Sequence, residues 1–280
     1  MSKIDIISAM VTDMTKHSLL DCVYIYRYFK HYYSYLILDK LNRSLVAFDC
    51  GDFVSSRLNI EKIMKETGAS FDYLFITHSH ERHCAGIKEW NKIHPKLNIV
   101  SGKKLSHLQQ KPVSDGDIFH IGNLSVYCMH TPGHTDDSFS YVVHEITESS
   151  TKTPLLFSGD TLFIGGTGKV AEGKYKEMYD SLNKLKNLPN ETLIFPGHAN
   201  ALENLTFAKM LEKSNPFLEQ KLTWAKENKD KHLAPSIMSE ERLYNPFLRT
   251  NQPMFKELTQ EEDPLNRFIK LRKLMDKLIK

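Results

Sequence analysis

The sequence predicts an α/β fold in which strands alternate with helices, followed by a helical C-terminal region. Short apolar runs bounded by turn-forming residues alternate with segments of helical periodicity as far as about residue 198. Beyond that point the apolar positions recur at helical spacing, with no strand pattern between the expected helices. The 280 residues are 41% hydrophobic and 25% charged, which is typical of globular proteins and sufficient to bury a full core.

The first half of the chain contains three well-marked strands. Apolar residues then recur at helical spacing from Ile60, and Gly68 marks the end of that helix. A second helix is expected at 87–93. The segment before residue 28 is ambiguous, although 10–14 and 23–26 could open a first sheet. The expected strands are 33–38, 44–49 and 71–76.

The second half repeats this alternation and then changes character. A helix with an apolar face is expected at 175–187. Asp263 as N-cap and Pro264 at the first helical position support a final helix. We therefore expect a main domain over 1–198 and a helical domain over 199–280. The expected strands are 117–121, 124–129, 140–144, 154–157 and 192–195, and the C-terminal helices are 204–211, 216–228 and 264–279.

Composition excludes several classes of function. The net charge of +3 is small and no block of Lys or Arg occurs, so we expect neither nucleic-acid nor membrane binding. No apolar run approaches the roughly 20 residues that span a bilayer. The N-terminus lacks the basic start and apolar core of a signal peptide, which predicts a cytoplasmic protein. The four cysteines form no CxxC pair and are expected to be reduced thiols.

Metal-compatible side chains occur where four of the expected strands end or turn. Glycine or proline stands beside each of these positions, which permits the tight turns that direct side chains out of a sheet edge. Imidazole and carboxylate groups suit zinc, and also iron or manganese. The other histidines are interpreted as ordinary surface or core residues. The set is His78, His80, His83, His134, Asp160 and His198.

These motifs resemble those of a known family. The segments 77–86, 131–135, 158–163 and 197–198 resemble, in order, the motifs of the metallo-β-lactamase superfamily. The segments 166–169, 204–208 and 245–249 are similar to glyoxalase II, the hydroxyacylglutathione hydrolase branch. The resemblance implies an αβ/βα sandwich of two mixed sheets with helices outside. It also implies that 1–198 is the catalytic domain and that the helical domain binds substrate.

The resemblance further implies two metal sites, one of which this chain alters. The first site would be His78, His80, His134 and Asp160. The second would be His83, His198 and the bridging Asp160, with Arg82 where the family has an aspartate. A guanidinium stays protonated and cannot bind a metal. Its charge would oppose each unit of cation charge by about 4 kcal/mol at 4 Å and an effective dielectric constant of 20. We therefore expect one metal ion, zinc in the first instance, with iron or manganese as alternatives.

The implied substrate is a small-molecule acyl thioester, with an S-acylglutathione as one candidate. Lys169 and Arg249 are the basic residues that the resemblance assigns to the carrier. The family's tyrosines at two further contacts are Ala171 and Asn200 here, and a lysine is Gln252. The loss of these groups weakens the case for glutathione itself.

The expected activity is hydrolysis of the thioester. A metal ion lowers the pKa of its water from 15.7 toward about 7, which supplies hydroxide for attack on the carbonyl. Asp160 holds the metal, and Arg82 is a candidate for stabilising the oxyanion. Two alternatives stay open. One is a pseudoenzyme that binds a ligand or a protein and pairs Arg82 with Asp160. The other is an enzyme with one iron, similar to the related persulfide dioxygenases.

Overall fold

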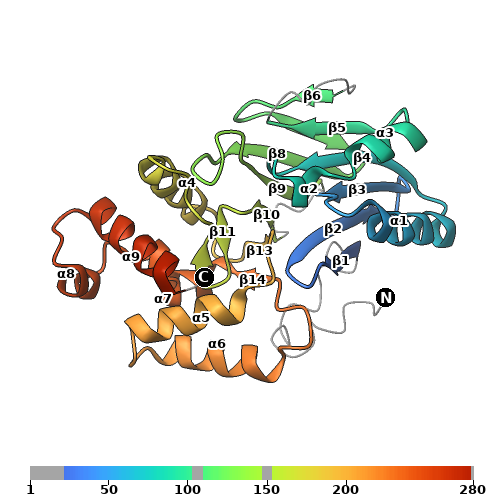
Figure 1. Ribbon diagram of the computed structural model, residues 1–280. Helices are drawn as coiled ribbons and strands as arrows, with labels where there is room; N and C mark the ends of the chain where they lie inside the picture. Colours follow the sequence, from blue (N-terminus) through green and yellow to red (C-terminus); the bar gives the residue numbers. More distant parts are fainter. Residues whose placement is uncertain (1–21, 103–109, 147–152, 279–280) are drawn as a thin grey trace.

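The computed structural model describes residues 22–102, 110–146 and 153–278 (Figure 1). Its first sheet has six strands in the order of the sequence. The first two pairs are antiparallel and the others are parallel. The strands are β1 (Val23–Tyr28), β2 (Tyr32–Asp39), β3 (Ser44–Phe48), β4 (Ser70–Ile76), β5 (Asn98–Ser101) and β6 (Gln110–Pro112).

The second sheet also has six strands, and its order departs from the sequence. Only β10 and β13 pair in parallel, and the other neighbours are antiparallel. A separate two-stranded hairpin is formed by β11 (Leu162–Phe163) and β12 (Gly166–Thr167). In spatial order the sheet consists of β14 (Ser236–Ile237), β13 (Leu193–Pro196), β10 (Leu155–Gly159), β9 (Phe139–Glu145), β8 (Leu124–His130) and β7 (Ile118–Ile121).

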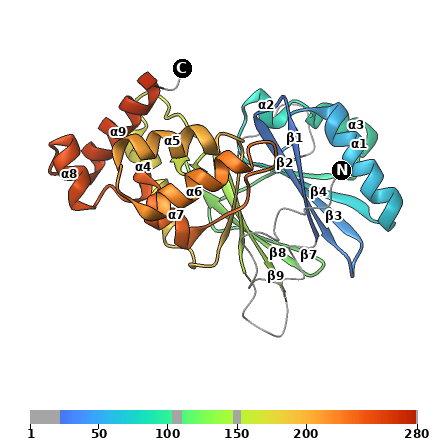
Figure 2. The same ribbon diagram turned by 90° about the horizontal axis from the view of Figure 1, so that it is seen from below.

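Helices cover the outer faces of both sheets (Figure 2). The helices α1 (Phe53–Thr67) and α3 (Ile87–Ile93) pack on the first sheet, where Ile60, Ile63 and Trp90 join its outer apolar residues. The helices α4 (Tyr175–Lys186) and α9 (Pro264–Leu278) pack on the second sheet. This is the αβ/βα sandwich that the resemblance implied. Among the described residues, no helix is long and apolar enough to cross a membrane.

The inner faces of the two sheets share one core of buried apolar side chains. Phe48 on β3 stacks on Phe157 on β10, with ring centroids 3.9 Å apart and planes 3° from parallel. Tyr35 and Phe195 extend this aromatic layer, at 5.3 Å between their rings. Burying one such side chain stabilises the fold by about 1.5–3 kcal/mol. The side chains on the inner face of each strand therefore hold the two sheets together, and their packing fixes which strand ends meet.

Local signals set the bounds of the helices. Asp52 is the N-cap of α1, and its carboxylate accepts a hydrogen bond from the Ser55 amide at 3.0 Å. Gly68 ends α1 in a left-handed conformation, φ 69°, and its N–H donates to the Met64 carbonyl. The predicted stop is confirmed. The short helix α2 (Glu81–Cys84) lies within the histidine-rich loop and positions His83.

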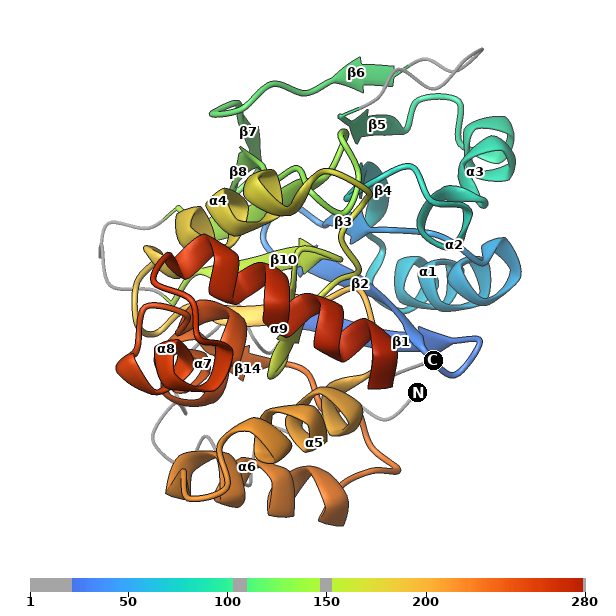
Figure 3. The ribbon, with the colours of Figure 1, turned by 60° about the vertical axis from the view of Figure 1, so that its left-hand side comes forward.

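The C-terminal region is not purely helical, and the expectation that no strand interrupts it was wrong. The strand β14 pairs antiparallel with β13, so Ile237 lies opposite Leu193. Its two residues are too few to show an alternating pattern. Figure 3 shows α9 beside α4 and the α5–α6 pair further away. The other elements of this region are α5 (Ala201–Leu211), α6 (Pro216–Glu227), α7 (Met238–Tyr244), η3 (Pro246–Leu248) and α8 (Pro253–Thr259).

Candidate metal centre

Loops at one end of the sandwich bring the predicted metal ligands together. His78 and His80 follow β4, His134 lies between β8 and β9, Asp160 follows β10, and His198 follows β13. At two positions these loops approach one another so closely that only glycine fits. A Cβ on Gly197 would lie 2.4 Å from Asp160 Oδ1, and one on Gly159, which has φ +51°, would lie 2.6 Å from the Thr77 Cβ.

One group of potential ligand atoms consists of His78, His80 and His134. Their nitrogens lie within 4.8 Å of one another, a spacing that could hold a metal ion. His80 Nδ1 lies 2.9 Å from His78 Nε2 and 2.9 Å from His134 Nε2. Asp160 Oδ2 is 3.4 Å from His134 Nε2. The four residues of the implied first site are therefore neighbours.

A second, overlapping group consists of His78, His83 and Asp160, again within 4.8 Å. His83 Nε2 lies 3.5 Å from Asp160 Oδ1. His198 Nε2 lies 2.9 Å from Asp160 Oδ2. Asp160 thus stands between both groups, with Oδ1 facing His83 and Oδ2 facing both His134 and His198.

Asp49 supports this centre, and the sequence analysis missed it. Its Oδ2 accepts from the Thr77 hydroxyl at 2.8 Å and bonds His83 Nδ1 at 2.8 Å, while Oδ1 accepts from the Thr77 amide. Asp49 is buried and has a left-handed backbone, φ 61°. The available signal was an acidic residue directly after an apolar strand. Such outer carboxylates orient metal-binding histidines and fix their tautomers.

The hydrogen bonds made by the outer ring nitrogens fit a metal ion at the centre. His134 Nδ1 bonds the Lys169 carbonyl at 2.7 Å, so Nδ1 carries the proton and Nε2 keeps its lone pair. His83 Nδ1 bonds Asp49, and His83 Nε2 and Asp160 Oδ1 are buried without a hydrogen-bond partner among the described residues. Buried polar atoms without partners are costly. Lone pairs and a carboxylate that converge in this way are the donor set that zinc or iron requires.

Burial and neighbouring charges shift the protonation of these groups. Burial, with the neighbouring histidines, lowers the pKa of His78 well below its ordinary value, and lowers that of His80 as well. Burial opposes the charge of Asp160, but His198 and His83 hold the pKa of this carboxyl far below its usual range. Burial also acts to lower the pKa of His83, but Asp160 and Asp49 outweigh it and raise that pKa. Metal ligands act as carboxylates and neutral imidazoles, so a bound ion would have to compete with a proton at His83.

Arg82 does not enter the centre. Its side chain is exposed, and its guanidinium carbon lies 4.7 Å from the Phe29 ring centroid and 5.7 Å from that of Tyr32. Within the described part of the chain it has no carboxylate within 4.0 Å, and the partners of Asp160 are histidines. The pairing of Arg82 with Asp160 expected for a pseudoenzyme is therefore absent from this structure.

The two basic residues assigned to the carrier differ in their surroundings. Lys169 is exposed, and its carbonyl holds His134. Arg249 forms an ion pair with Glu212 through both terminal nitrogens, and the two side chains are only 13% and 16% exposed. An anion would have to displace Glu212 to reach Arg249. The role of both residues in binding substrate stays a prediction.

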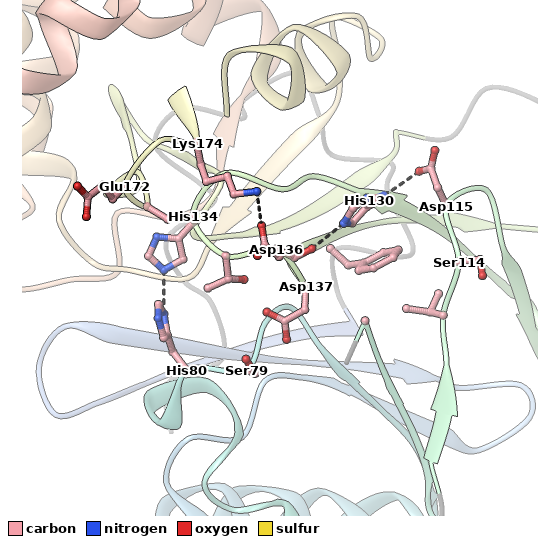
Figure 4. A pocket seen from close by; sticks show the side chains of 15 residues that line it. Ser79, His80, Ser114, Asp115, His130, His134, Asp136, Asp137, Glu172 and Lys174 are labelled. Atoms are coloured by element: carbon pink, nitrogen blue, oxygen red, sulfur yellow. Dashed lines mark hydrogen bonds and ion pairs between the residues drawn. The ribbon is translucent and has the colours of Figure 1, made fainter. Parts of the chain in front are cut away.

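A groove of about 1060 Å³ opens beside the first group (Figure 4). His80 and His134 stand at one end, and Asp115 and His130 stand at the other. Four carboxylates and a single lysine line it. That lysine pairs with one carboxylate, and Lys184 from outside the lining pairs with another, so the groove keeps an excess of two carboxylates. No sequence motif marks these carboxylates, which come from separate segments of the chain. They are Asp115, Asp136, Asp137 and Glu172, and the lysine is Lys174.

Comparison with known proteins agrees with this architecture. Residues 29–198 match the metallo-beta-lactamase superfamily, and residues 200–278 match the hydroxyacylglutathione hydrolase C-terminus. The hydroxyacylglutathione hydrolase-like protein of Gallus gallus is 35% identical over 237 residues, which cover 83% of this chain and 82% of that protein. The Mus musculus protein of the same name is also 35% identical, over 83% of this chain and 81% of its own.

Solved structures show the same fold. A metallo-beta-lactamase from Staphylococcus aureus has a TM-score of 0.59 at 24% identity, covering 90% of this chain and 70% of its own. ETHE1 from Myxococcus xanthus has a TM-score of 0.56 at 24% identity, covering 88% of this chain and 99% of its own. Because both family models match and the curated relatives are 35% identical over 83% of the chain, the chain belongs to the metallo-β-lactamase superfamily and is glyoxalase II-like.

Proposed function

We propose that this protein is a metal-dependent hydrolase of acyl thioesters that holds a single ion through His78, His80, His134 and Asp160. The observation that carries the proposal is the convergence of imidazole lone pairs and one carboxylate at the mouth of a large groove. A bound divalent ion would supply a water of lowered pKa and would polarise the carbonyl of the substrate. Zinc suits this donor set, and iron or manganese is compatible with it.

The residues of the chain prepare this chemistry by orientation. The Lys169 carbonyl fixes the ring of His134, and Asp49 fixes the ring of His83. Asp160 supplies the negative charge that balances a divalent cation, and its low pKa keeps it ionised at neutral pH. The groove beside His80 and His134 gives the substrate its access. We also propose that the chain divides into a catalytic domain, 1–198, and a helical domain, 199–280.

The second site that the family resemblance implies is proposed to hold no ion of its own. His83, His198 and Asp160 are in place, but the fourth position is Arg82, whose side chain turns away onto aromatic rings. Two imidazoles and a carboxylate that is already shared give a weak site for a second divalent ion. With one ion the enzyme loses one of the two contacts that stabilise the oxyanion, so we expect slow turnover.

Elemental analysis and a thioester assay on the same purified protein test the proposal. We expect about one zinc or iron per chain and hydrolysis of a panel of acyl thioesters that includes S-lactoylglutathione. Asp160→Asn should lose both the ion and more than about 100-fold in rate, because even residues that only orient ligands change activity by about 10–100-fold. The matched control is Asp180→Asn, an exposed aspartate on α4 that pairs with Lys176 and should change neither.

A pseudoenzyme is the second candidate, favoured by the missing acidic ligand at Arg82. Gentle purification that yields no metal, together with no hydrolysis of any thioester, would support it and reject the hydrolase. An iron-containing protein that consumes oxygen with a persulfide substrate, and does not hydrolyse thioesters, would instead support the dioxygenase reading.

A further inference from the structure

The β1–β2 hairpin forms a wall over the His83 and His198 side of the centre. The Tyr33 amide donates to the Gly197 carbonyl at 2.9 Å, and the Ala199 amide donates to the His31 carbonyl at 2.8 Å. The ring of Tyr32 lies 4.5 Å from that of His198 and 5.9 Å from that of His83. The tip of the hairpin is therefore fixed against the loop that carries His198.

Arg82 is held against this wall in a defined orientation. Its guanidinium lies over the rings of Phe29 and Tyr32, and its carbonyl accepts a hydrogen bond from the Tyr28 hydroxyl. Contact with ring faces leaves the N–H groups in the guanidinium plane free to donate. In residues 22–278, where the structure describes them, no carboxylate lies within 4.0 Å of these donors. An exposed arginine that is oriented in advance loses less entropy when it binds a planar anion.

Charge differs between the two sides of the centre. The hairpin side presents the guanidinium of Arg82, which lies over Phe29 and Tyr32. The groove on the other side presents Asp115, Asp136, Asp137 and Glu172; Lys184 pairs with the first of these and Lys174 with the second, so two carboxylates remain in excess. A carboxylate on the substrate would be attracted to the first side and repelled by the second. The centre thus distinguishes the two ends of a substrate by charge.

We infer that Arg82 is a specificity-determining residue that binds a carboxylate of the substrate, while the uncharged or cationic part of the substrate occupies the acidic groove. The inference rests on the proposed thioester hydrolysis and names the class of substrate: a thioester with an anionic group on one side of the scissile bond. A planar carboxylate can accept two parallel hydrogen bonds from a guanidinium, which a compact ammonium cannot match. Phe29 and Tyr32 act as positioning residues for this contact.

The test uses four thioesters in which the acyl group and the thiol each come in a neutral and an anionic form. Succinyl and butanoyl groups are each joined to N-acetylcysteamine, which is neutral, and to glutathione, which is anionic. For each protein the kcat/KM of every charged thioester is divided by that of butanoyl-N-acetylcysteamine. Arg82→Gln should lower at least one of these ratios by about 10-fold or more, mainly through KM, because a charge-assisted pair is lost. Arg82→Lys should recover part of the ratio, and Phe29→Leu should lower it less.

Arg57→Gln is the matched control. Arg57 is another exposed arginine next to a ring, 5.9 Å from the Phe53 centroid, but it lies on α1 and pairs with Glu61. Its ratios should equal those of the wild type. If Arg82→Gln lowers all four rates equally, Arg82 only holds the hairpin, and the inference is rejected. If that variant does not fold by circular dichroism, Arg82→Lys and Phe29→Leu decide by the same ratios.

A binding measurement separates this inference from the proposed function. If the wild type hydrolyses no thioester, the hydrolase proposal fails, and titration with succinate, compared with the uncharged succinamide, still tests Arg82. Succinate should shift the Arg82 side-chain resonance in NMR spectra, and Arg82→Gln should weaken succinate binding by about 10-fold. If succinate binds the wild type and Arg82→Gln equally, or does not bind the wild type, the inference is overturned.

Discussion

The two halves of the candidate metal centre differ in access and in completeness. The half formed by His78, His80 and His134 opens on the groove, and His80 is exposed. The half around His83 is closed: that ring is 1% exposed, is held by Asp49 and lies beneath Tyr32. The closed half is the more rigidly supported one, yet it lacks an acidic ligand of its own. Well-oriented histidines and a complete set of acidic ligands are therefore separate properties of the two halves.

The position of Arg82 explains how the closed half tolerates its missing ligand. Turning a guanidinium inward would bury a charge beside histidines and would add positive charge where a cation is expected. Stacking on Phe29 and Tyr32 keeps the charge in contact with water and gives each ring contact about 0.5–1 kcal/mol. His83 meanwhile keeps its hydrogen bond to Asp49.

Substituting one histidine in each half tests most directly whether the open half holds the ion. His134→Gln should remove the ion and nearly all hydrolysis, whereas His198→Gln should leave about one ion per chain. Both rings are partly exposed and both face Asp160 Oδ2, at 3.4 and 2.9 Å, so they are well matched. Metal content by mass spectrometry is the measurement. Loss of the ion from His198→Gln alone would place the single site in the closed half.

Asp49→Asn tests how far the closed half supports the open one. The substitution keeps the shape but removes the charge that Thr77 and His83 contact. Because Thr77 also bonds His78 Nδ1 at 3.1 Å, we expect metal affinity to fall by about 10–100-fold. Competition with a chelator gives the affinity. An unchanged affinity would mean that the two halves are independent.

Arg82→Asp tests whether the closed half can be completed. The substitution supplies the missing carboxylate next to His83, and His83 Nε2 and Asp160 Oδ1 are already buried without partners in the described chain. We expect the metal count to rise from about one toward two per chain. Arg57→Asp is the control, because it makes the same change of charge away from the centre. A count that stays at one would show that the hairpin wall, and not the missing ligand, excludes the second ion.

Glu212→Gln should have the smallest effect on metal binding at the centre. It tests whether Arg249, the partner of Glu212, binds substrate or only stabilises the fold. Partial burial acts to raise the pKa of Glu212, but hydrogen bonds from Arg249 and Asn215 outweigh it and lower the pKa. A lowered carboxyl pKa means stability that is present at neutral pH and lost as the pH falls through the folded-state pKa. The variant should be less stable by about 1.5 kcal/mol at neutral pH, and the difference should shrink in acid.

Urea titrations at several pH values measure this effect, and metal content should not change. If the variant instead gains affinity for glutathione thioesters, Arg249 is a carrier-binding residue that Glu212 masks. If stability alone changes, Arg249 has a structural role, and its assignment to the substrate is incorrect.

Strongly patterned elements could be predicted from the sequence, and weakly patterned ones could not. The apolar run of β2 and the apolar positions of β8 gave bounds within a few residues, and Gly68 gave the end of α1, whereas its start at Phe53 was placed too late, at Ile60. The short strands β5 and β6 and the short helices α7 and α8 were missed, because a few residues cannot establish a period. The strand β14 exists only because β13 offers it an edge.

The residues of the candidate site divide in the same way. His78, His80, His134 and Asp160 could be found because each follows a strand and stands beside a turn. Asp49 had no motif around it, and the acidic groove draws its residues from segments far apart in the sequence. Their importance depends on distances that only the folded chain sets.

The sequence alone determined the alternation of strands and helices, the strand ends and the set of metal-compatible side chains, because period, turn residues and chemistry are local properties. The sandwich was implied by the family resemblance. The sequence also determined that a guanidinium replaces a carboxylate at position 82. Only the tertiary structure decided where that guanidinium lies, since Phe29 and Tyr32 come from a hairpin remote in sequence. The same holds for the closed and open halves, because burial and electrostatic polarity arise from packing between segments.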